Sequence, residues 1–378
     1  MTMTKKSIFV SSVLCVALCV FAGCKSTENV DLSKAIDLEH HFIHPDYIDY
    51  VKSRTEYPYY KEGLGICYSG TSFIPIDTPQ NFNQSDLAKG RKLVDIVTDL
   101  DDIRIAELDD AGVSTAVLSA GQGIEELPRE EAVRLARATN DAVAAAIKRH
   151  PGRYQGSICL PALYVEESVA ELERAVKELG LKYWHTHSNY GGHYLFEEQF
   201  EPILAKCAEL GVPFYLHQQY PSTPYLNSFG MNIGGAGLGF GVDVTRTATL
   251  LIMNGIFDKY PNLVMILGHM AEFFPYCLTR MDDRFGNAKE TGMDPYDKSK
   301  QSFTYYFQHN IMMTTSGIFD PSVVMFAINK IGIDHIMLGT DFPYENFRDA
   351  VKFVKDLPIS DEDKAKILYK NAETYILK

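Results

Sequence analysis

Short apolar runs that end in a polar residue recur along the chain and predict buried strands. Each run is rich in aliphatic or β-branched residues and lacks the strict alternation of a half-exposed strand. This pattern is typical of parallel strands that are buried on both faces. The runs are Ile36–His41, Val113–Ser119, Tyr154–Leu160, Leu181–His187, Pro213–His217, Val264–His269, Ile311–Thr315 and His335–Thr340. They number eight, which is the strand number of an α/β barrel.

Segments with helical periodicity lie between these runs. They are Arg129–Arg149, Ser168–Leu179, Phe200–Leu210, Val244–Phe257 and Pro321–Lys330. Gly180, Gly211 and Gly332 follow three of them, where a helix commonly ends. Because strands and helices alternate without a second domain boundary, the sequence predicts the fold class α/β and one (β/α)8 TIM barrel over residues 35–378.

Two segments depart from the alternation of strand and helix. Pro45–Gln84 is rich in Tyr, Pro, Gly and Asn without clear periodicity, which predicts a long functional or disordered loop over the barrel mouth. Gly230–Gly241 is glycine-rich and is a second candidate lid. Its glycines can be aligned with a dinucleotide-binding fingerprint, but no βα turn or suitably spaced acidic residue supports that interpretation. We therefore expect no phosphate binding there.

The first residues predict a targeting signal and are set apart from the fold. Lys5 and Lys6 precede the apolar stretch Ile8–Ala22, and small residues close it before Cys24. This arrangement resembles the lipobox of bacterial lipoproteins, although Phe21 stands where Leu is usual. Ordinary signal cleavage and retention as an anchor are therefore alternatives. A transmembrane helix is disfavoured because the stretch is shorter than the roughly 20 residues that such a helix needs.

The targeting signal sets the expected location of the protein. We expect a lipoprotein signal peptide over residues 1–23 and a linker over residues 24–34. The mature protein would be a lipoprotein of the bacterial cell envelope, on its periplasmic or surface side, held at the membrane through a lipidated Cys24. The other cysteines show no CxxC spacing, which favours buried free thiols over a disulfide.

Composition and charge exclude some partners. With 378 residues and 46% hydrophobic content, the chain is long enough to bury the core of one barrel domain. A net charge of -13 argues against a nucleic-acid partner, because phosphate binding needs a basic face. The charge does not argue against a small anionic substrate.

Side chains of metal-binding types stand at the carboxyl ends of the predicted strands. They are Glu39 and His41, His217, and Asp341. Taken singly, each has a structural explanation: a surface cluster of His40, His41 and His44, a core histidine at His217, a helix N-cap at Asp341 and a structural role for His269. Because the carboxyl ends of barrel strands meet at one face, the side chains are placed to converge. Their coincidence predicts a metalloenzyme.

Several longer stretches carry a family resemblance. They are Leu38–Phe42, Val212–His217, Gly255–Leu263, Ile266–Glu272, Thr314–Phe319 and Gly339–Asn346. Through them the chain resembles the amidohydrolase-related branch of the amidohydrolase superfamily. It is most similar to the metal-dependent non-oxidative decarboxylases, such as γ-resorcylate, dihydroxybenzoate and aminocarboxymuconate-semialdehyde decarboxylases. The Glu-x-His start at Glu39 and His41 is specific, since hydrolytic members more often carry His-x-His.

The resemblance implies a barrel of the metal-dependent hydrolase type with a defined set of site residues. Glu39, His41, His217 and Asp341 would bind one divalent metal, Zn²⁺ or Mn²⁺, and nitrogen and oxygen ligands without thiolates suit both metals. His269 would be the catalytic histidine, oriented by Glu272. The expected reaction is decarboxylation of a small, hydroxylated aromatic carboxylate, with Asp341 or His269 protonating the ring carbon. Relatives form dimers or tetramers, so a homo-oligomer is expected.

Two other functions use the same residues. In the first, the metal activates water to hydrolyse a lactone or an amide. In the second, the chain is a lipid-anchored barrel that binds a metal or ligand without catalysis. His185, His187 and Asn189 follow a predicted strand and differ from what the decarboxylases tend to carry there. We expect them to contact substrate, with ordinary polar loop residues as the alternative.

Overall fold

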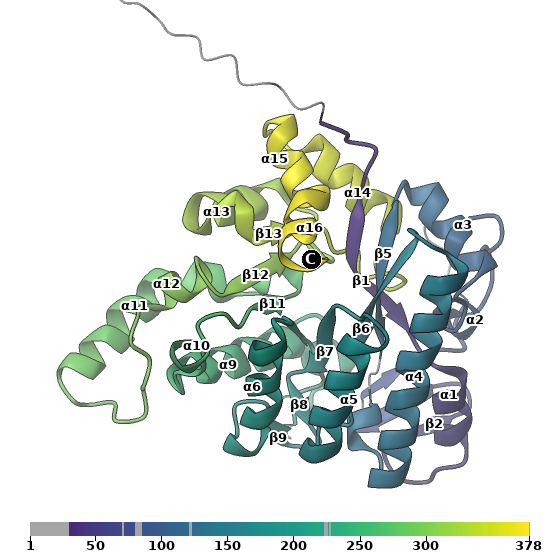
Figure 1. Ribbon diagram of the computed structural model, residues 1–378, viewed down its shortest axis with the longest axis horizontal. Helices are drawn as coiled ribbons and strands as arrows, with labels where there is room; N and C mark the ends of the chain where they lie inside the picture. Colours follow the sequence, from purple (N-terminus) through teal and green to yellow (C-terminus); the bar gives the residue numbers. More distant parts are fainter. Residues whose placement is uncertain are drawn as a thin grey trace, which may run out of the picture. The chain divides into compact units, whose positions relative to one another are not determined.

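Eight parallel strands form the central sheet of the computed structural model (Figure 1). In spatial order they are β1 (Ile36–Phe42), β5 (Thr115–Ala120), β6 (Tyr154–Ile158), β7 (Tyr183–His187), β10 (Phe214–His217), β11 (Met265–Leu267), β12 (Ile311–Thr314) and β13 (Ile336–Met337). Every neighbouring pair is parallel. The eight predicted strands are therefore confirmed, although several are shorter than the apolar runs that predicted them.

The chain beyond β13 returns to β1 and closes the sheet. The backbone N–H of Leu38 donates to the carbonyl of Leu338 at 3.1 Å, and that of His41 donates to the carbonyl of Phe342 at 2.8 Å. His40 and Phe342 form a parallel bridge. Because both edges of the sheet are paired in this way, the fold is a (β/α)8 barrel, as predicted.

The structure describes residues 30–69, 72–79, 85–120, 123–222, 226 and 228–377. Residues 31–378 form one unit. The predicted signal peptide over residues 1–23 and the predicted lipidation site Cys24 lie outside the described residues. Within these ranges, no helix is long and apolar enough to cross a membrane.

Helices connect the strands and cover the outside of the barrel (Figure 1). Before β10 they are α1 (Pro45–Lys52), α2 (Leu93–Val97), α3 (Asp102–Ala111), α4 (Arg129–Arg149), α5 (Val165–Lys177) and α6 (Glu201–Leu210). After β10 they are α8 (Met231–Gly234), α9 (Gly239–Met253), α10 (Ile256–Lys259), α11 (Phe274–Glu290), α12 (Phe303–Phe307), α13 (Pro321–Ile331), α14 (Phe347–Asp356), α15 (Asp361–Ala365) and α16 (Asn371–Tyr375).

The predicted helices are found with small shifts of their ends. The bounds of α4 are those predicted. Its first turn carries Glu130 and Glu131 and its last turn carries Lys148 and Arg149, and charges in these positions interact favourably with the helix dipole. Gly211 caps α6 with φ +67°, as predicted. The predicted helix Val244–Phe257 is instead divided between α9 and α10, because Gly255 takes φ +73° and interrupts it.

The segment Pro45–Gln84 is more ordered than its sequence predicted. Its described part contains α1 and an antiparallel sheet of β2 (Tyr59–Lys61), β3 (Gly65–Ser69) and β4 (Ser72–Ile74). The interpretation of this part as one long loop is therefore wrong. Strands of three to five residues are too short to give a clear periodic pattern.

This small sheet packs on apolar side chains next to the barrel. Ile66 and Ile74 share a buried cluster with Ile48 and Val51 of α1 and with Leu135 of α4. Because burial of apolar area is the main favourable term in folding, these contacts stabilise an arrangement that the local sequence specifies only weakly.

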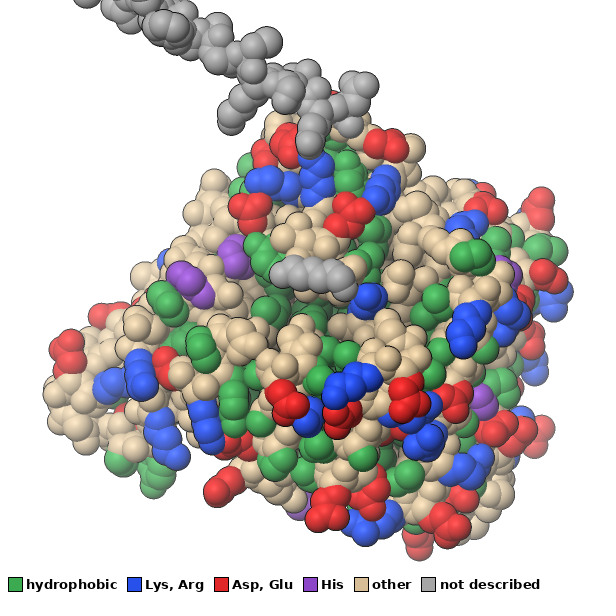
Figure 2. All heavy atoms as spheres, in the orientation of Figure 1, with side chains coloured by type: hydrophobic (Ala, Val, Ile, Leu, Met, Phe, Trp, Pro, Cys, Tyr) green, Lys and Arg blue, Asp and Glu red, His purple; other side chains and the backbone are tan. Residues whose placement is uncertain are grey.

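The surface agrees with the sequence analysis. On the face shown in Figure 2, Lys and Arg side chains lie among Asp and Glu side chains over the helices, and ion pairs such as Arg174–Asp141 and Lys206–Glu209 connect them.

The described cysteines form no disulfide. The predicted free thiols are therefore confirmed, and three of them are buried as predicted, whereas Cys277 is exposed and its predicted burial is wrong.

Candidate active site

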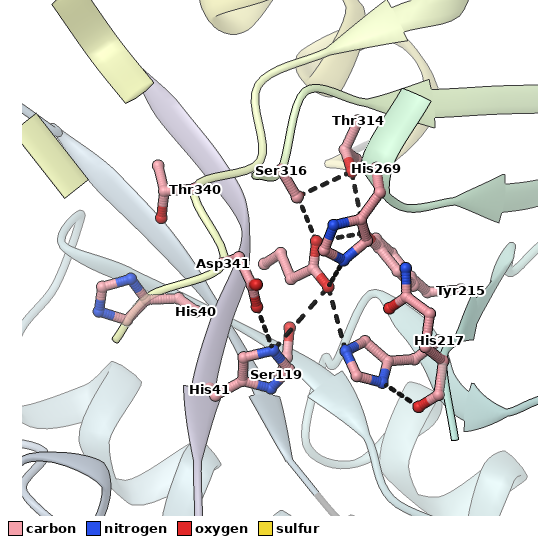
Figure 3. A network of polar contacts seen from close by, with 12 residues as sticks. His40, His41, Ser119, Tyr215, His217, His269, Thr314, Ser316, Thr340 and Asp341 are labelled. Carbon is pink, nitrogen blue, oxygen red and sulfur yellow. Dashed lines mark hydrogen bonds and ion pairs between the residues drawn. The ribbon is translucent and has the colours of Figure 1, made fainter. Parts of the chain in front are cut away.

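The predicted metal-binding side chains meet at one end of the barrel. Glu39 and His41 come from β1, His217 ends β10, and Asp341 follows β13. All four are buried, and their ligand atoms lie within 4.8 Å of one another. Figure 3 shows His41, His217 and Asp341 pointing toward a common centre. The predicted convergence of side chains that are distant in sequence is confirmed.

Hydroxyl groups hold the Glu39 carboxylate in place. The Tyr215 hydroxyl donates to Glu39 Oε2 at 2.6 Å, and the Ser316 hydroxyl donates to the same oxygen. The other oxygen, Oε1, is buried without a hydrogen-bond partner among the described residues and lies 3.2 Å from His217 Nε2. Because a buried carboxylate oxygen normally has a partner, Oε1 is suited to bind a cation.

The pKa shifts of His41, His217 and Glu39 favour metal binding. Burial lowers the pKa of His41 to about 4 and that of His217 to about 4, so both imidazoles are neutral near pH 7. Burial alone would raise the pKa of Glu39, but contact with His217 and the nearby His269 outweighs it and the pKa lies well below its usual value. Neutral imidazoles and an ionised carboxylate are the states that bind metals.

His269 begins a left-handed turn after β11. His269, Met270, Ala271 and Glu272 have φ values of 50°, 53°, 56° and 56°. Left-handed backbone costs roughly 1–2 kcal/mol per non-glycine residue, and such strain is concentrated at functional sites. Asp341, at the opposite side of the site, has φ 59° as well. The surrounding fold therefore holds the backbone of both residues in a conformation that the local sequence disfavours.

His269 lies among carboxylates. Its Nε2 is 3.7 Å from Glu39 Oε1. Burial lowers the pKa of His269, but the surrounding carboxylates outweigh burial and the pKa lies above its usual value. These carboxylates belong to Glu39, Asp341, Glu272 and Glu345. A raised pKa keeps a proton on the imidazole that is available for transfer.

Glu272 and Asp341 have distinct surroundings. Glu272 Oε1 accepts from Gln218 Nε2 at 3.0 Å, and its charge contributes to the raised pKa of His269. Its predicted role in orienting His269 remains a prediction. Asp341 Oδ1 lies 3.0 Å from His41 Nε2. Burial and the neighbouring Glu39 carboxylate raise the pKa of Asp341 well above its usual value.

His40 does not join this cluster. Its side chain is fully buried; Nδ1 lies 2.9 Å from Asp37 Oδ2, and the ring stacks on Phe342 at 4.2 Å between centroids. Thr340 also donates to Asp37 through its hydroxyl and its backbone N–H. His41 is buried too, so the surface-cluster alternative for these two histidines is wrong. His40 and Asp37 instead support the closure of the barrel.

A cavity of about 310 Å³ opens onto the cluster. His41, His217, His269 and Asp341 form its floor. Its walls come from the small antiparallel sheet, the glycine-rich segment and the loops beyond β10 and β13: Phe73, Ile74, Pro75, Gln218, Tyr220, Met231, Asn232, Gly235, Ala236, Gly237, Phe240, Tyr344 and Glu345. Both segments expected near the barrel mouth, Pro45–Gln84 and Gly230–Gly241, therefore line the cavity.

The residues predicted to contact substrate lie outside this lining. His185 and His187 are buried on β7, and His187 Nδ1 lies 2.7 Å from Glu125 Oε1. Asn189 donates to the carbonyl of Tyr220 at 3.0 Å and to Asp243 at 2.8 Å. Their substrate contacts remain a prediction.

Some residues of the site were not identified in the sequence. Tyr215 and Ser316 hold Glu39, Gln218 holds Glu272, and Tyr344 and Glu345 line the cavity. Tyr215 lies two residues before His217 in a strand, and residues with this spacing share a face. That spacing was the one available signal for Tyr215.

Comparison with known proteins places these residues in context. A family model described as amidohydrolase matches residues 36–375. The γ-resorcylate decarboxylase of Polaromonas sp. strain JS666 is 36% identical over 290 residues, which cover 73% of this chain and 86% of that enzyme. The γ-resorcylate decarboxylase of Rhizobium radiobacter is 32% identical over 284 residues, which cover 72% of this chain and 86% of that enzyme.

Solved structures show the same fold. The crystal structure of 2,6-dihydroxybenzoate decarboxylase from Rhizobium has a TM-score of 0.74 and 26% identity, covering 90% of this chain and 98% of that one. The 5-carboxyvanillate decarboxylase of Novosphingobium aromaticivorans, complexed with manganese and 4-hydroxy-3-methoxy-5-nitrobenzoic acid, has a TM-score of 0.78 and 29% identity, covering 90% of this chain and 95% of that one.

Proposed function

The chain belongs to the amidohydrolase family, and from this premise we propose that it is a metal-dependent non-oxidative decarboxylase of a small aromatic carboxylate. The observation that carries the proposal is the convergence of Glu39, His41, His217 and Asp341 beneath a cavity that also contains His269. The similar enzymes are named as decarboxylases of γ-resorcylate, 2,6-dihydroxybenzoate and 5-carboxyvanillate. Neither hydrolysis nor loss of catalysis is favoured by these relatives.

The residues present fit a divalent metal. Glu39 Oε1 is buried without a hydrogen-bond partner among the described residues, and it converges with two neutral imidazoles and the carboxylate of Asp341. This donor set suits Zn²⁺ or Mn²⁺. A divalent metal held by these residues would supply the positive charge that binds the substrate carboxylate and a neighbouring hydroxyl oxygen.

The cavity itself gives a reason for metal dependence. Among the described residues that line it there is no Lys or Arg, whereas Glu345 and Asp341 are acidic. An aromatic acid therefore finds no fixed cation in the described walls. Phe73, Ile74 and Phe240 supply apolar surface for a ring. We infer that these walls hold the ring and exclude water, while the carboxylate faces the floor.

Protein groups then supply the proton. Protonation of the ring carbon that bears the carboxylate forms a C–H bond, the bond to the carboxyl carbon breaks, and its electron pair returns to the ring as carbon dioxide leaves. Two floor residues are candidates for the donor: His269, through a ring nitrogen, and Asp341, through a carboxyl oxygen. The pKa of His269 is raised by the surrounding carboxylates, which favours a proton on its imidazole at neutral pH. Glu272, held by Gln218, would stabilise the protonated state of His269.

Decarboxylation is tested with a panel of substrates. Purified protein is given hydroxybenzoates, including 2,6-dihydroxybenzoate, and separately lactones and amides, each with and without added Mn²⁺ or Zn²⁺. We expect carbon dioxide release and a matching ultraviolet change from a hydroxybenzoate only when metal is present. Turnover of a lactone or an amide without carbon dioxide release would instead establish the hydrolytic alternative.

Three further proposals rest on the sequence and the family. We propose that the mature chain is a lipid-anchored envelope protein attached through Cys24. We also propose a homo-oligomer, a dimer or tetramer, because the decarboxylases that the chain resembles form such assemblies, and closed symmetric dimers are the commonest soluble assemblies. Light scattering that gives a monomer at micromolar concentration would contradict it. As the metal we propose Zn²⁺ or Mn²⁺.

A further inference from the structure

His185 is a buried histidine with both ring nitrogens unused. His185 is 2% exposed, and neither its Nδ1 nor its Nε2 has a hydrogen-bond partner among the described residues. On β7 it pairs in register with Tyr215, just as His187 pairs with His217. His185 therefore lies one layer below His217, inside the barrel and beneath the site.

Its ring faces two of the proposed metal ligands. The ring centroid of His185 is 4.9 Å from that of His217 and 6.0 Å from that of His41. One ligand atom from each of these histidines lies within 4.8 Å of those of the other two. Since a Zn–N bond is about 2.0–2.1 Å long, ring movements of an ångström or less would bring one nitrogen of each histidine within reach of one ion.

Two donor sets consequently overlap at this site. Glu39, His41, His217 and Asp341 form a set with two carboxylates, and His41, His185 and His217 form a set of three imidazoles. The sets share His41 and His217. His217 Nδ1 donates to the carbonyl of Gln218 at 2.7 Å, which leaves Nε2 as its ligand atom. Because the two sets share His41 and His217, they are alternatives for one ion and do not form two independent sites.

Metals differ in their preference between such sets. Carboxylate oxygens suit Mn²⁺, whereas imidazole nitrogens suit Zn²⁺. We propose that His185 is a metal ligand of this chain and that the alternative set His41–His185–His217 makes the centre selective for Zn²⁺ over Mn²⁺. This inference rests on the proposed metal site and deepens it by an alternative donor set and by the choice of ion.

A purely structural role leaves the burial of His185 unexplained. Other buried histidines have a partner for at least one ring nitrogen: His40 has Asp37, His187 has Glu125 and His217 has the carbonyl of Gln218. The ring of His185 lies beside that of Tyr215 at 5.6 Å, a contact that uses no nitrogen. Burying two polar atoms without partners is costly, and a metal bond removes part of that cost.

The test compares metal affinities of variants. Apo protein is prepared with a chelator from wild type, from His185→Phe and from the matched control His187→Asn, which changes the next inward-facing histidine of β7. The dissociation constants for Zn²⁺ and Mn²⁺ are measured by competition with a chromophoric chelator. Circular dichroism of each apo protein reports folding. Phe keeps a ring beside Tyr215 and removes both nitrogens.

We expect His185→Phe to weaken Zn²⁺ binding by at least about tenfold. Loss of a residue that only hydrogen-bonds to a metal ligand already weakens metal binding by this factor. Mn²⁺ binding should change much less, and His187→Asn should preserve the metal preference. Equal effects of His185→Phe on both metals, or no effect on either, would overturn the inference while leaving the decarboxylase proposal intact. A wild type that binds neither metal would overturn both.

A second measurement needs no variant. X-ray absorption of Zn²⁺-loaded wild-type protein counts the imidazoles bound to the ion through their multiple-scattering signal. Three imidazoles are the expected result. Two imidazoles would refute the role of His185 even if His185→Phe failed to fold.

Discussion

Glu39 is the residue on which the electrostatics of the site depend. One of its oxygens accepts from Tyr215 and Ser316, and the other lies close to the nitrogens of His217 and His269. Its low pKa and the raised pKa of Asp341 have related causes, since the Glu39 charge disfavours a second charge nearby. One ionised and one protonatable carboxyl therefore share the centre.

A first prediction separates catalysis from metal binding. His269→Asn should retain the metal and lose roughly a hundredfold or more in turnover, the usual size of a general acid-base contribution. Glu272→Gln should cause a smaller loss, because it removes one of several charges that raise the pKa of His269. Steady-state rates and metal content check both variants. If His269→Asn emptied the metal site, His269 would be a ligand; if it changed neither quantity, the residue would be structural.

Single residues differ in how far the sequence identified them. Glu39, His41, His217 and Asp341 were predictable because they lie in the C-terminal half of a predicted strand or directly after one, where barrel geometry brings side chains together. Ser316 was not, since a serine beyond a strand carries no distinctive chemistry. Its role appears only when the fold places it beside Glu39, 277 residues away in the sequence.

At the scale of elements, strands and a left-handed turn supply different residues of the site. β1 and β10 present metal ligands in a buried parallel sheet, whereas the left-handed turn from His269 to Glu272 places the catalytic candidates. α9 supports this turn closely, because a Cβ on Gly241 would lie 2.8 Å from Glu272 Oε2 and 3.0 Å from the Phe273 ring. Gly241 therefore leaves room for the Glu272 and Phe273 side chains, which would have to move if a larger residue replaced it.

A second prediction follows for Gly241→Ala. Alanine normally stabilises a helix interior relative to glycine by roughly 0.5–1 kcal/mol, but here the methyl group must displace Glu272 or Phe273. We expect a lower melting temperature and lower turnover with unchanged metal content, since the metal ligands lie on other elements. Gly286→Ala in α11 is the matched control, because nothing lies within 4 Å of its added Cβ. Equal melting temperatures and rates for the two variants would refute this account of the turn.

The sequence predicted elements best where their pattern was long. All eight barrel strands and α4 were identified from runs of apolar or periodic positions. β2, β3 and β4 were missed because they are short and depend on packing against α1 and α4. The left-handed turn was also missed, since tertiary contacts override the local preference of His269 and Met270 for right-handed backbone.

At the scale of the whole molecule, barrel closure fixes the position of the chemistry. Hydrogen bonds from β1 to the segment beyond β13 join the first and last parts of the barrel, which brings Glu39 and Asp341 together. The lining of the cavity comes from segments far apart in the chain. Composition alone predicted a large buried core but not which segments would cover the barrel mouth.

A third prediction concerns the location of the protein in the cell. If Cys24 is lipidated, the mature chain begins at this residue and fractionates with membranes, because the attached lipid supplies the anchor. Cys24→Ser should release the protein or block its processing. Mass spectrometry of the amino terminus and membrane fractionation check this expectation. Recovery of the unprocessed wild-type chain from the soluble cytoplasm would contradict it.

Metal content tests the central claim most directly. The purified wild-type protein should contain about one equivalent of Zn²⁺ or Mn²⁺ by elemental analysis, as expected for a mononuclear catalytic site. His41→Ala and His217→Ala, which each remove a ligand from the cluster, should remain folded and lose the metal. A wild-type protein that takes up neither ion after incubation with both, or variants that retain the ion fully, would contradict the account.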